Sequence, residues 1–429
     1  MNNRKILSLI ISVALLASCA DYTPHTTVSA LKGFSGDNQM QNEVISISTE
    51  IPEVDTEASK TVSIDVSGEN KYIHIDSLVE SCRFIPLETN EKSLVGDVAN
   101  IQFDGDRIFV YDSNNSCLME FNDKGKFISR IGSEGRGPGE YIEMGNYALD
   151  RKSKHVYILD IAGQKLECYD YNGRHLKSQP MFYMFSAFAF NRDNIFALTR
   201  WWGEINRGIP NFDKHQLIIA DRKLVPEQAF GFNNPQLYNG YFSADGRIVS
   251  CDGGIYYNDI LVPDTIWFIG SDKAEAVATF TCGKRGKAFS ADEIKTLTDD
   301  NYYDMLKKKN ICDIDKYAIT KDLVYVLLST NQGFKNVIYC RKTRHFTNYT
   351  THGTKAIKSL YYKLWGVNEL DYTDGELFYR VLQPHKLVAN RKFFTPEDYA
   401  RIPENERKMY KSVKEEDNPI LMVFKFKEF

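Results

Sequence analysis

The run Arg107-Ile108-Phe109-Val110-Tyr111-Asp112 is matched 48 positions later by His155-Val156-Tyr157-Ile158-Leu159-Asp160. The turn glycines Gly125 and Gly173, which follow the two runs, keep the same separation. Each copy contains a short β-rich run ending in Asp, a polar turn, a second run, further turn residues and a third run, as in an antiparallel meander. A repeat of about 40 to 50 residues built this way indicates a β-propeller blade, whose sheet needs a neighbour on each face.

The pattern continues through the chain with looser spacing. We take one position in each unit as equivalent, which predicts six blades: Ile108, Val156, Ile195, Ile248, Val324 and Leu377. The widest gap contains a helix-like segment from Ser290 to Lys309, where Ser290 and Glu293 form a capping-box pattern. A second helical insert is expected from Thr395 to about Lys414.

A closed ring must join its two ends, and the chain ends in a strand-like run at 420–426. Two early runs, around Val62 and Phe84, have no partner nearby, so we expect a strand near Val62 or Phe84 to pair into the blade that holds Leu377 and Phe424. The sequence therefore predicts an all-β protein: a six-bladed β-propeller over residues 61–429 with small helical insertions, closed by its N- and C-terminal strands.

Residues 1–18 resemble a lipoprotein signal peptide, with Arg4 and Lys5 before an apolar run of about eleven residues. That run is too short to span a bilayer, which needs about 20 residues. Leu16-Ala17-Ser18-Cys19 resembles a bacterial lipobox, so we expect a lipid on Cys19; the alternative is an ordinary secretory signal that happens to contain a Cys. Residues 19–60 are polar and acidic, which predicts a disordered tether. The expected location is the cell envelope, at the outer membrane.

Composition excludes some classes of function. A net charge of -4 and a pI near 6.1 provide no basic surface for nucleic acid. The eight Cys lack Cys-x-x-Cys spacing, so most are expected to be small buried hydrophobes, with one incidental disulfide left open. The eight His lack metal-ligand spacing, and no Gly-x-Ser-x-Gly elbow is present. We therefore predict no metal and no cofactor, with calcium in the axial channel as a minor alternative.

Several motifs resemble a known family. The loop Gly135 to Tyr141 resembles the Gly-rich linker between NHL-type propeller blades. Together with the lipobox, the Phe84 to Glu88 run and the final Asn418-Pro419, it resembles the six-bladed β-propeller lipoproteins of Bacteroidetes. This resemblance covers essentially all of 61–429 and implies a fold and an envelope location, without a common activity.

The Gly-rich loop is the first candidate ligand site. Arg136 could hold a carboxylate or phosphate and Glu140 could accept from sugar hydroxyls, with Tyr141 beside them. The structural alternative is a crossover between blades whose glycines make a tight turn, and we favour it. Aspartates recur at strand ends, where they usually cap turns: Asp112, Asp160 and Asp221.

Aromatic clusters form the second candidate site. Arg200-Trp201-Trp202 could stack a sugar or aromatic ligand, because adjacent strand residues point to opposite faces and one Trp must leave the core side. The alternative for this cluster is packing between blades, and the sequence does not decide between the two. Tyr256 and Tyr257 form a similar cluster, for which core packing is the favoured interpretation.

Two functions remain. The first is a lipid-anchored binding or scaffold protein for a glycan, a peptide or an envelope protein. The alternative is a hydrolase or lyase acting on polysaccharide or peptide at the channel mouth, which requires titratable groups from three or more blades to converge there. The fold does not choose between them, although no local catalytic motif favours the enzyme.

Overall fold

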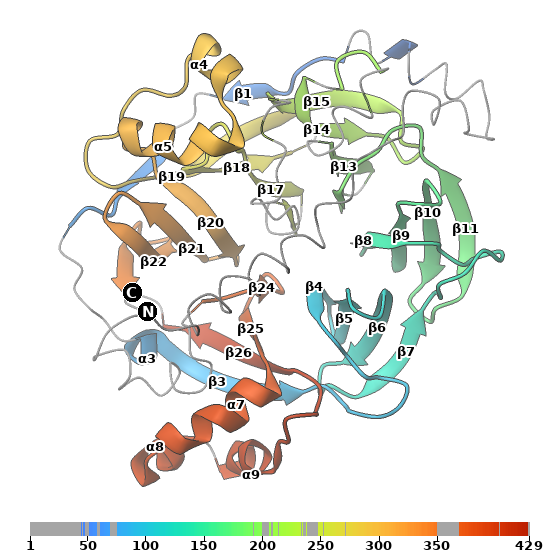
Figure 1. Ribbon diagram of the computed structural model, residues 1–429, viewed down its shortest axis with the longest axis vertical. Helices are drawn as coiled ribbons and strands as arrows, with labels where there is room; N and C mark the ends of the chain where they lie inside the picture. Colours follow the sequence, from blue (N-terminus) through green and yellow to red (C-terminus); the bar gives the residue numbers. More distant parts are fainter. Residues whose placement is uncertain are drawn as a thin grey trace, which may run out of the picture.

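The chain forms six sheets arranged in a ring around a central axis (Figure 1). The computed structural model describes residues 44, 46–47, 51–57, 61–68, 75–191, 193–199, 206, 209–212, 214–232, 234, 237, 248–251, 253–270, 272–349, 369–402 and 404–427. The prediction of a six-bladed β-propeller is confirmed. Cys19 and the Arg200-Trp201-Trp202 cluster lie outside the described residues.

Blades 1 to 3 are each formed by four consecutive antiparallel strands. Blade 1 contains β4 (Val98–Asp104), β5 (Arg107–Asp112), β6 (Cys117–Asn122) and β7 (Phe127–Ile131). Blade 2 contains β8 (Met144–Asp150), β9 (His155–Asp160), β10 (Lys165–Asp170) and β11 (His175–Pro180). Blade 3 contains β12 (Ala187–Asn191), β13 (Asn194–Leu198), β14 (His215–Ala220) and β15 (Pro226–Phe232).

Blades 4 to 6 complete the ring, with the first strand of each again nearest the axis. Blade 4 contains β16 (Ile248–Cys251), β17 (Gly254–Asn258), β18 (Thr265–Ile269) and β19 (Lys273–Thr281). Blade 5 contains β20 (Asp313–Ile319), β21 (Leu323–Thr330), β22 (Gly333–Cys340) and β23 (Phe346–Tyr349). Blade 6 contains β24 (Tyr372–Thr373), β25 (Phe378–Leu382), β26 (Ile420–Phe426) and, from the N-terminal side, β3 (Val79–Pro86).

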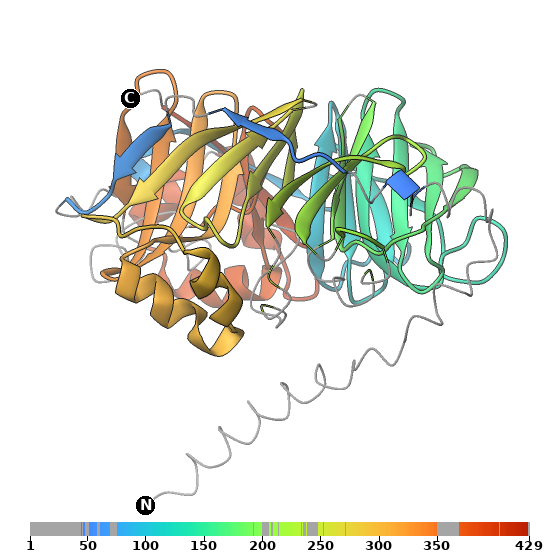
Figure 2. The same ribbon diagram turned by 90° about the horizontal axis from the view of Figure 1, so that it is seen from above.

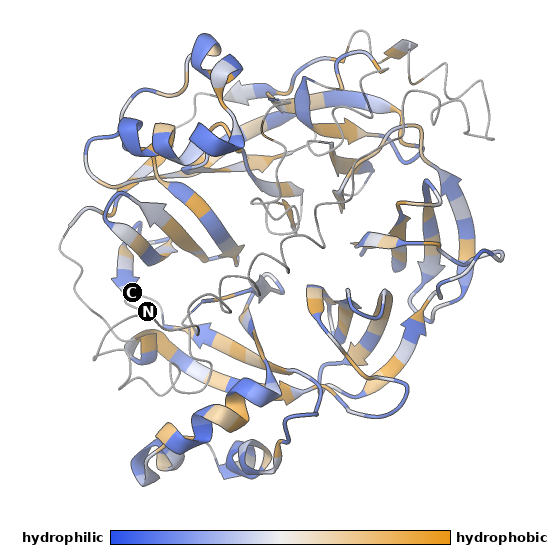
Figure 3. Ribbon diagram, viewed as in Figure 1, coloured by the Kyte–Doolittle hydropathy of each residue, from blue (hydrophilic) through white to orange (hydrophobic). Residues whose placement is uncertain are grey.

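Both faces of each sheet are buried, as the repeat requires. Six apolar clusters fill the six seams between neighbouring blades, and apolar residues recur along the strands in Figure 3. In β5, Phe109 faces blade 2 while Ile108 and Val110 face blade 6. Burying one large apolar side chain stabilises the fold by roughly 1.5–3 kcal/mol, so the seams are the main source of stability.

The repeat is visible in the turns as well. Gly125 and Gly173 lie in the turns that follow the third strands of blades 1 and 2, with φ values of 78° and 81°. A Cβ on Gly125 would lie 2.1 Å from the carbonyl oxygen of Pro86 in the preceding blade. Both turns therefore need glycine, because the backbone has a positive φ and passes close to the backbone of the preceding blade. This requirement explains why glycine recurs at the spacing of the repeat.

The ring is closed by strands from both ends of the chain. β26 pairs antiparallel with β3, with Met422 opposite Phe84, so the prediction for Phe84 is confirmed. The other run, β2 (Val62–Asp65), instead pairs in parallel with β19 of blade 4. Alternation of apolar residues marked β2 as a strand but did not specify which sheet edge it joins.

A strap from the N-terminal side crosses the outer strands of blades 3 and 4. The Val54 N–H donates to the Ala229 carbonyl at 2.9 Å, and the Ala229 N–H donates to the Pro52 carbonyl at 3.0 Å. β1 (Asp55–Glu57) then pairs in parallel with the start of β19. The expected tether of 19–60 therefore includes a segment that lies on the propeller, since Ile51 and Val54 bury their side chains there.

One equivalent position was assigned to the wrong strand. Ile248 lies on β16, the inner strand of blade 4, whereas Ile108 and Val156 lie on second strands. The residue that corresponds to them is Ile255 on β17. Gly253 lies in the turn between β16 and β17 and Gly254 begins β17. Such a turn looks the same in sequence whether it joins the first two strands of a blade or the second and third.

The helices lie in connections between strands or beside β3. α4 (Ala291–Thr296) and α5 (Asp299–Lys309) form the first insert, and the Ser290–Glu293 capping box is present. The Ser290 N–H bonds the carboxylate and lowers the pKa of Glu293 to about 2. The second insert contains α7 (Pro384–Asn390), η5 (Arg391–Phe393), α8 (Pro396–Arg401) and α9 (Glu404–Ser412), and the short α3 (Ile75–Leu78) precedes β3.

Strand direction places both inserts at one face of the ring. Because strands alternate in direction, connections between second and third strands and connections between blades leave from the same face. We name this the insert face; it carries the connections 132–143, 282–312 and 383–419. Figure 2 shows α4 and α5 projecting from it.

Asn418 joins the two ends of the chain, and its removal is expected to weaken ring closure. Its buried side chain donates to the carbonyls of Glu88 (2.8 Å) and Ser93 (2.5 Å) and accepts from the Val95 N–H (2.9 Å). Asn418→Ala leaves these groups without partners, so we expect a loss of roughly 2–4 kcal/mol in the free energy of unfolding, measured by urea denaturation. Asn172→Ala, in an exposed turn, is the control; equal stability of the two variants would contradict this role.

Candidate functional site

The Gly-rich loop folds onto itself. The Gly135 N–H donates to the Tyr141 carbonyl (2.8 Å), and the Gly137 N–H donates to the Glu140 carboxylate (2.7 Å). A Cβ on Gly135 would lie 2.0 Å from a Glu140 carboxylate oxygen. The Glu140 carboxylate is therefore hydrogen-bonded within the loop, as expected for a crossover between blades.

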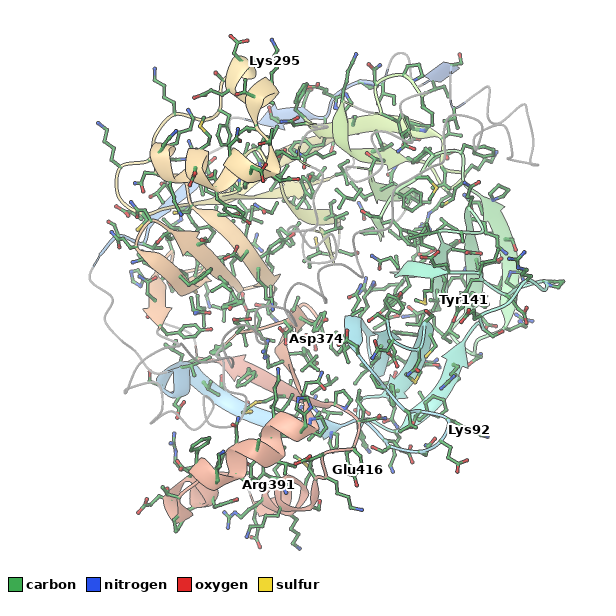
Figure 4. All side chains as sticks on the ribbon, viewed as in Figure 1. Lys92, Tyr141, Lys295, Asp374, Arg391 and Glu416 are labelled. Carbon is green, nitrogen blue, oxygen red and sulfur yellow. The ribbon has the colours of Figure 1, made fainter. Side chains whose placement is uncertain are left out.

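Tyr141 and Arg136 occupy opposite environments. Tyr141 is fully buried in the seam between blades 1 and 2 (Figure 4), its hydroxyl donates to the Ser116 carbonyl (2.8 Å), and burial raises its pKa. A ligand at the surface therefore cannot reach Tyr141. Arg136 is exposed and makes no hydrogen bond or ion pair with the described part of the chain, so it alone of the three is free to contact a ligand.

The two tyrosines of β17 belong to different seams. Tyr257 is fully buried between blades 3 and 4, where its hydroxyl donates to Gln216 Oε1 at 2.7 Å. Tyr256 faces blade 5, where burial raises its pKa and its hydroxyl accepts from Arg341 at 2.9 Å. Both are packing residues, and neither lies beside the Gly-rich loop.

A cavity of about 280 Å³ lies on the axis of the ring, lined by the inner strands of all six blades. Many of its lining side chains are polar, in contrast to the apolar seams; they include Gln102, Asn146, Arg151, Ser250, Lys316 and Asp371. This axial channel is the candidate site, and none of its lining residues is among the site residues predicted from the sequence.

Hydrogen bonds from channel residues bridge every seam at its inner end. In order around the ring, the bonds are Gln102 to the Tyr147 carbonyl (3.0 Å), Asn146 to the Ser186 carbonyl (3.3 Å), Ser250 to the Phe190 carbonyl (3.2 Å), Tyr317 to the Tyr256 carbonyl (3.1 Å), Lys316 to Asp371 (2.9 Å) and Tyr372 to the Ala99 carbonyl (3.3 Å). The polar lining therefore orients the blades relative to one another.

Charged groups are concentrated between blades 5 and 6. Lys316 Nζ lies 2.9 Å from Asp371 and 3.4 Å from Glu369, and Arg380 also pairs with Asp371. Arg151 follows the inner strand of blade 2 and so lies toward the opposite face, where it donates to the Phe103 carbonyl (3.1 Å). Titratable groups of three blades therefore line the channel, but they are not gathered at one mouth.

A Ser, a His and a Glu meet beneath the Gly-rich loop without forming a catalytic relay. His175 Nε2 lies 2.7 Å and Ser178 Oγ 2.6 Å from the same oxygen of Glu167, which is fully buried. In a catalytic triad, the carboxylate and the hydroxyl bond different ring nitrogens of the histidine. Here both partners share one carboxylate oxygen, and the cluster serves to satisfy a buried charge.

The strand-end aspartates cap turns, as the sequence indicated. Asp112 accepts from the Asn114 N–H (3.0 Å) and Asp221 from the Lys223 N–H (2.8 Å). Asp160 accepts from the Gly163 N–H (2.9 Å) and from the Glu143 N–H (3.0 Å), so it also holds the incoming crossover. Among the residues that the structure describes, no group of three or more His, Cys, Asp or Glu side chains could hold a metal ion.

Gly139 is expected to be essential for the loop, whereas Arg136 is not. A Cβ on Gly139 would lie 2.6 Å from the His175 ring, and its φ of 73° disfavours a side chain. Gly139→Ala should therefore lower the free energy of unfolding by about 1–3 kcal/mol, and Arg136→Ala should leave it unchanged. Chemical denaturation of both variants tests this, and a stable Gly139→Ala protein would refute the packing interpretation.

Two solved structures from Bacteroides are similar to this chain, and the first of them supports the fold. A solved protein of Bacteroides fragilis NCTC 9343, described as exported, has a TM-score of 0.67 at 19% identity over 86% of this chain and 100% of that chain. A member of the duf4221 family from Bacteroides vulgatus has a TM-score of 0.47 at 12% identity, over 82% of this chain and 97% of that chain. No curated protein matches the chain.

No helix in the described part of the chain is long and apolar enough to cross a membrane. The model of a protein family, described as Domain of unknown function (DUF4934), matches residues 60–425. The chain belongs to this DUF4934 family.

Proposed function

We propose that this chain is an exported, lipid-anchored propeller with NHL-like repeats that acts as a binding or scaffold protein in the cell envelope. Its partner is a glycan, a peptide or an envelope protein. The observation that carries the proposal is the axial channel, where five of the six blades contribute polar side chains to the lining of an open space. A ring that needed only to close could fill its centre with aliphatic side chains, as its seams do.

The Lys316–Asp371 pair is the proposed contact point for a ligand. Asp371 directly precedes β24, so it lies at the insert-face end of the channel, and it joins blades 5 and 6. Paired charges of opposite sign can accept and donate hydrogen bonds at once, as recognition of a polar ligand requires.

The alternative is a hydrolase or lyase with its site at the same mouth. Three blades contribute charged groups to the channel, as this function requires, but Arg151 lies toward the face opposite Lys316 and Asp371. Lys316 and Asp371 are paired with each other and Arg151 donates to the Phe103 carbonyl, and the described lining contains neither His nor Cys. Mass spectrometry of each bound probe after incubation distinguishes the two functions, because an enzyme releases shorter products and a binding protein returns the probe intact.

Substitution of Lys316 tests the binding site. Lys316→Met removes the charge at similar length, and we expect affinity for a bound probe to fall about tenfold, the loss expected when one charge-assisted hydrogen bond disappears. The probes are an oligosaccharide array and a library of envelope-derived peptides, and hits are quantified by calorimetry.

Lys321→Met is the matched control for that experiment. Lys321 also joins blades 5 and 6, through Glu376 at 2.6 Å, but its side chain lies outside the channel. Melting temperatures of both variants separate lost binding from lost folding. Equal affinities in the two variants, or no bound probe at all, would count against the proposed function.

Cys19 tests the proposed anchor. Cys19→Ser removes the thiol that would carry the lipid, and one or two acyl chains account for most of the membrane affinity of such proteins. We expect the variant to move from the membrane pellet to the soluble fraction in cell fractionation. Cys251→Ser, which alters a half-buried cysteine of the propeller, should stay in the pellet; a pelleted Cys19→Ser protein would exclude lipid anchoring at this residue.

A further inference from the structure

A second pocket lies on the outer side of blade 4, away from the axial channel. It is open to solvent, encloses about 590 Å³, and is formed where β18 and β19 meet β2. Its lining combines an indole, several hydroxyls and a guanidinium; the main residues are Ser63, Thr265, Trp267, Thr279, Thr281 and Arg285. None of the sequence motifs pointed to this position.

Strand register places the hydroxyls in one row. Thr265 on β18 is paired with Thr279 on β19, and Thr279 is paired with Ser63 on β2. Paired residues project from the same face of a sheet, so three neighbouring strands present hydroxyls side by side. The Thr265 and Thr279 Oγ1 atoms are 2.8 Å apart, which fixes the orientation of that pair.

Trp267 lies two residues after Thr265 on β18, so its side chain projects from the same face of the sheet. One edge of its indole packs against Phe230 of blade 3, with ring centroids 5.5 Å apart, and the side chain as a whole is half-buried. Because the indole is already held in place and is partly exposed, it offers a rigid apolar surface and loses little conformational entropy when a ligand binds.

Arg285 supplies further donors. Its Nε and Nη2 both donate to the carboxylate of the fully buried Asp264, Nη2 at 3.2 Å. Its Nη1 donates to the Gly286 carbonyl (3.2 Å). A guanidinium has five N–H donors, so about two remain for a ligand. Because Asp264 neutralises the charge of Arg285, the pocket suits a neutral ligand with hydroxyl acceptors better than an anion.

The position of Trp267 is what distinguishes blade 4 from its neighbours. Strand register aligns Trp267 with Ile218 in blade 3 and with Met422 in blade 6, and both of those side chains are fully buried in a seam. Trp267 is only half-buried. Of the hydroxyls beside it, Thr265 is buried and also bonds Asp264 (3.2 Å), whereas Thr279 is half-buried and Ser63 is exposed, so the last two are the ones that a ligand can reach.

We propose that this pocket binds a neutral pyranose unit of a saccharide. The apolar C–H face of the sugar packs on Trp267, the Thr279 and Ser63 hydroxyls donate to and accept from sugar hydroxyls, and Arg285 donates to a sugar oxygen. The site goes beyond the function proposed for the axial channel, because it shares no lining residue with that channel.

The test uses the full mature protein and named probes. Laminarihexaose, xylohexaose and mannohexaose are titrated while tryptophan fluorescence and heat are recorded, and trigalacturonic acid is the anionic comparison. We expect a neutral hexasaccharide to bind, and Thr279→Val, which removes a hydroxyl at constant shape, to weaken it about tenfold. Trp267→Ala should abolish binding, with the melting temperature measured because this ring also packs against Phe230.

Matched variants separate this proposal from the previous one. Thr347→Val makes the same change on the outer strand of blade 5 and should leave binding intact, as should Lys316→Met in the channel. Loss of binding in Lys316→Met with full binding in Thr279→Val would place the sugar in the channel and overturn the lateral site alone. Failure of all three neutral probes, or preference for trigalacturonic acid, would also overturn it.

Discussion

Burial of both faces of every sheet is the constraint on which the rest of this structure depends. A four-stranded sheet with apolar side chains on both sides is stable only between two neighbours, so no blade can exist alone. β3 shows the consequence most directly: Phe84 packs into the seam between blades 5 and 6, and Ile85 into the seam between blades 6 and 1. One strand from the N-terminal side therefore completes two seams, and separation of the chain ends would open both.

The repeat could be predicted from the sequence wherever the local backbone conformation requires a particular residue type. Gly125 and Gly173 recur because each backbone approaches the preceding blade, and Asp112 and Asp160 recur because each caps the same turn. Where no such rule operated, prediction failed. Nothing local in Ile248 distinguishes an inner strand from a second strand, and alternation alone could not show which sheet edge β2 would join.

The candidate site was harder to predict for a related reason. Arg136 and Glu140 attracted attention because Gly, Arg and Glu in one loop are typical of ligand binding, yet the same residue types build a self-bonded crossover. Lys316 and Asp371 are 55 positions apart, on neighbouring blades. A polar pair of that kind has no sequence signature, because each partner by itself is an ordinary charged residue near a strand.

The polar lining of the channel also constrains how a ligand can act there. An apolar seam is non-directional and tolerates small rotations of one blade against the next, whereas a hydrogen bond such as that from Gln102 to the Tyr147 carbonyl favours one register. A ligand that displaced Lys316 from Asp371 would have to replace that bond, since an unpaired charge in a confined site is costly. The ligand that fits best therefore adds to the existing pairs and leaves them intact, which favours a partner rich in hydroxyl or amide groups over a strongly charged one.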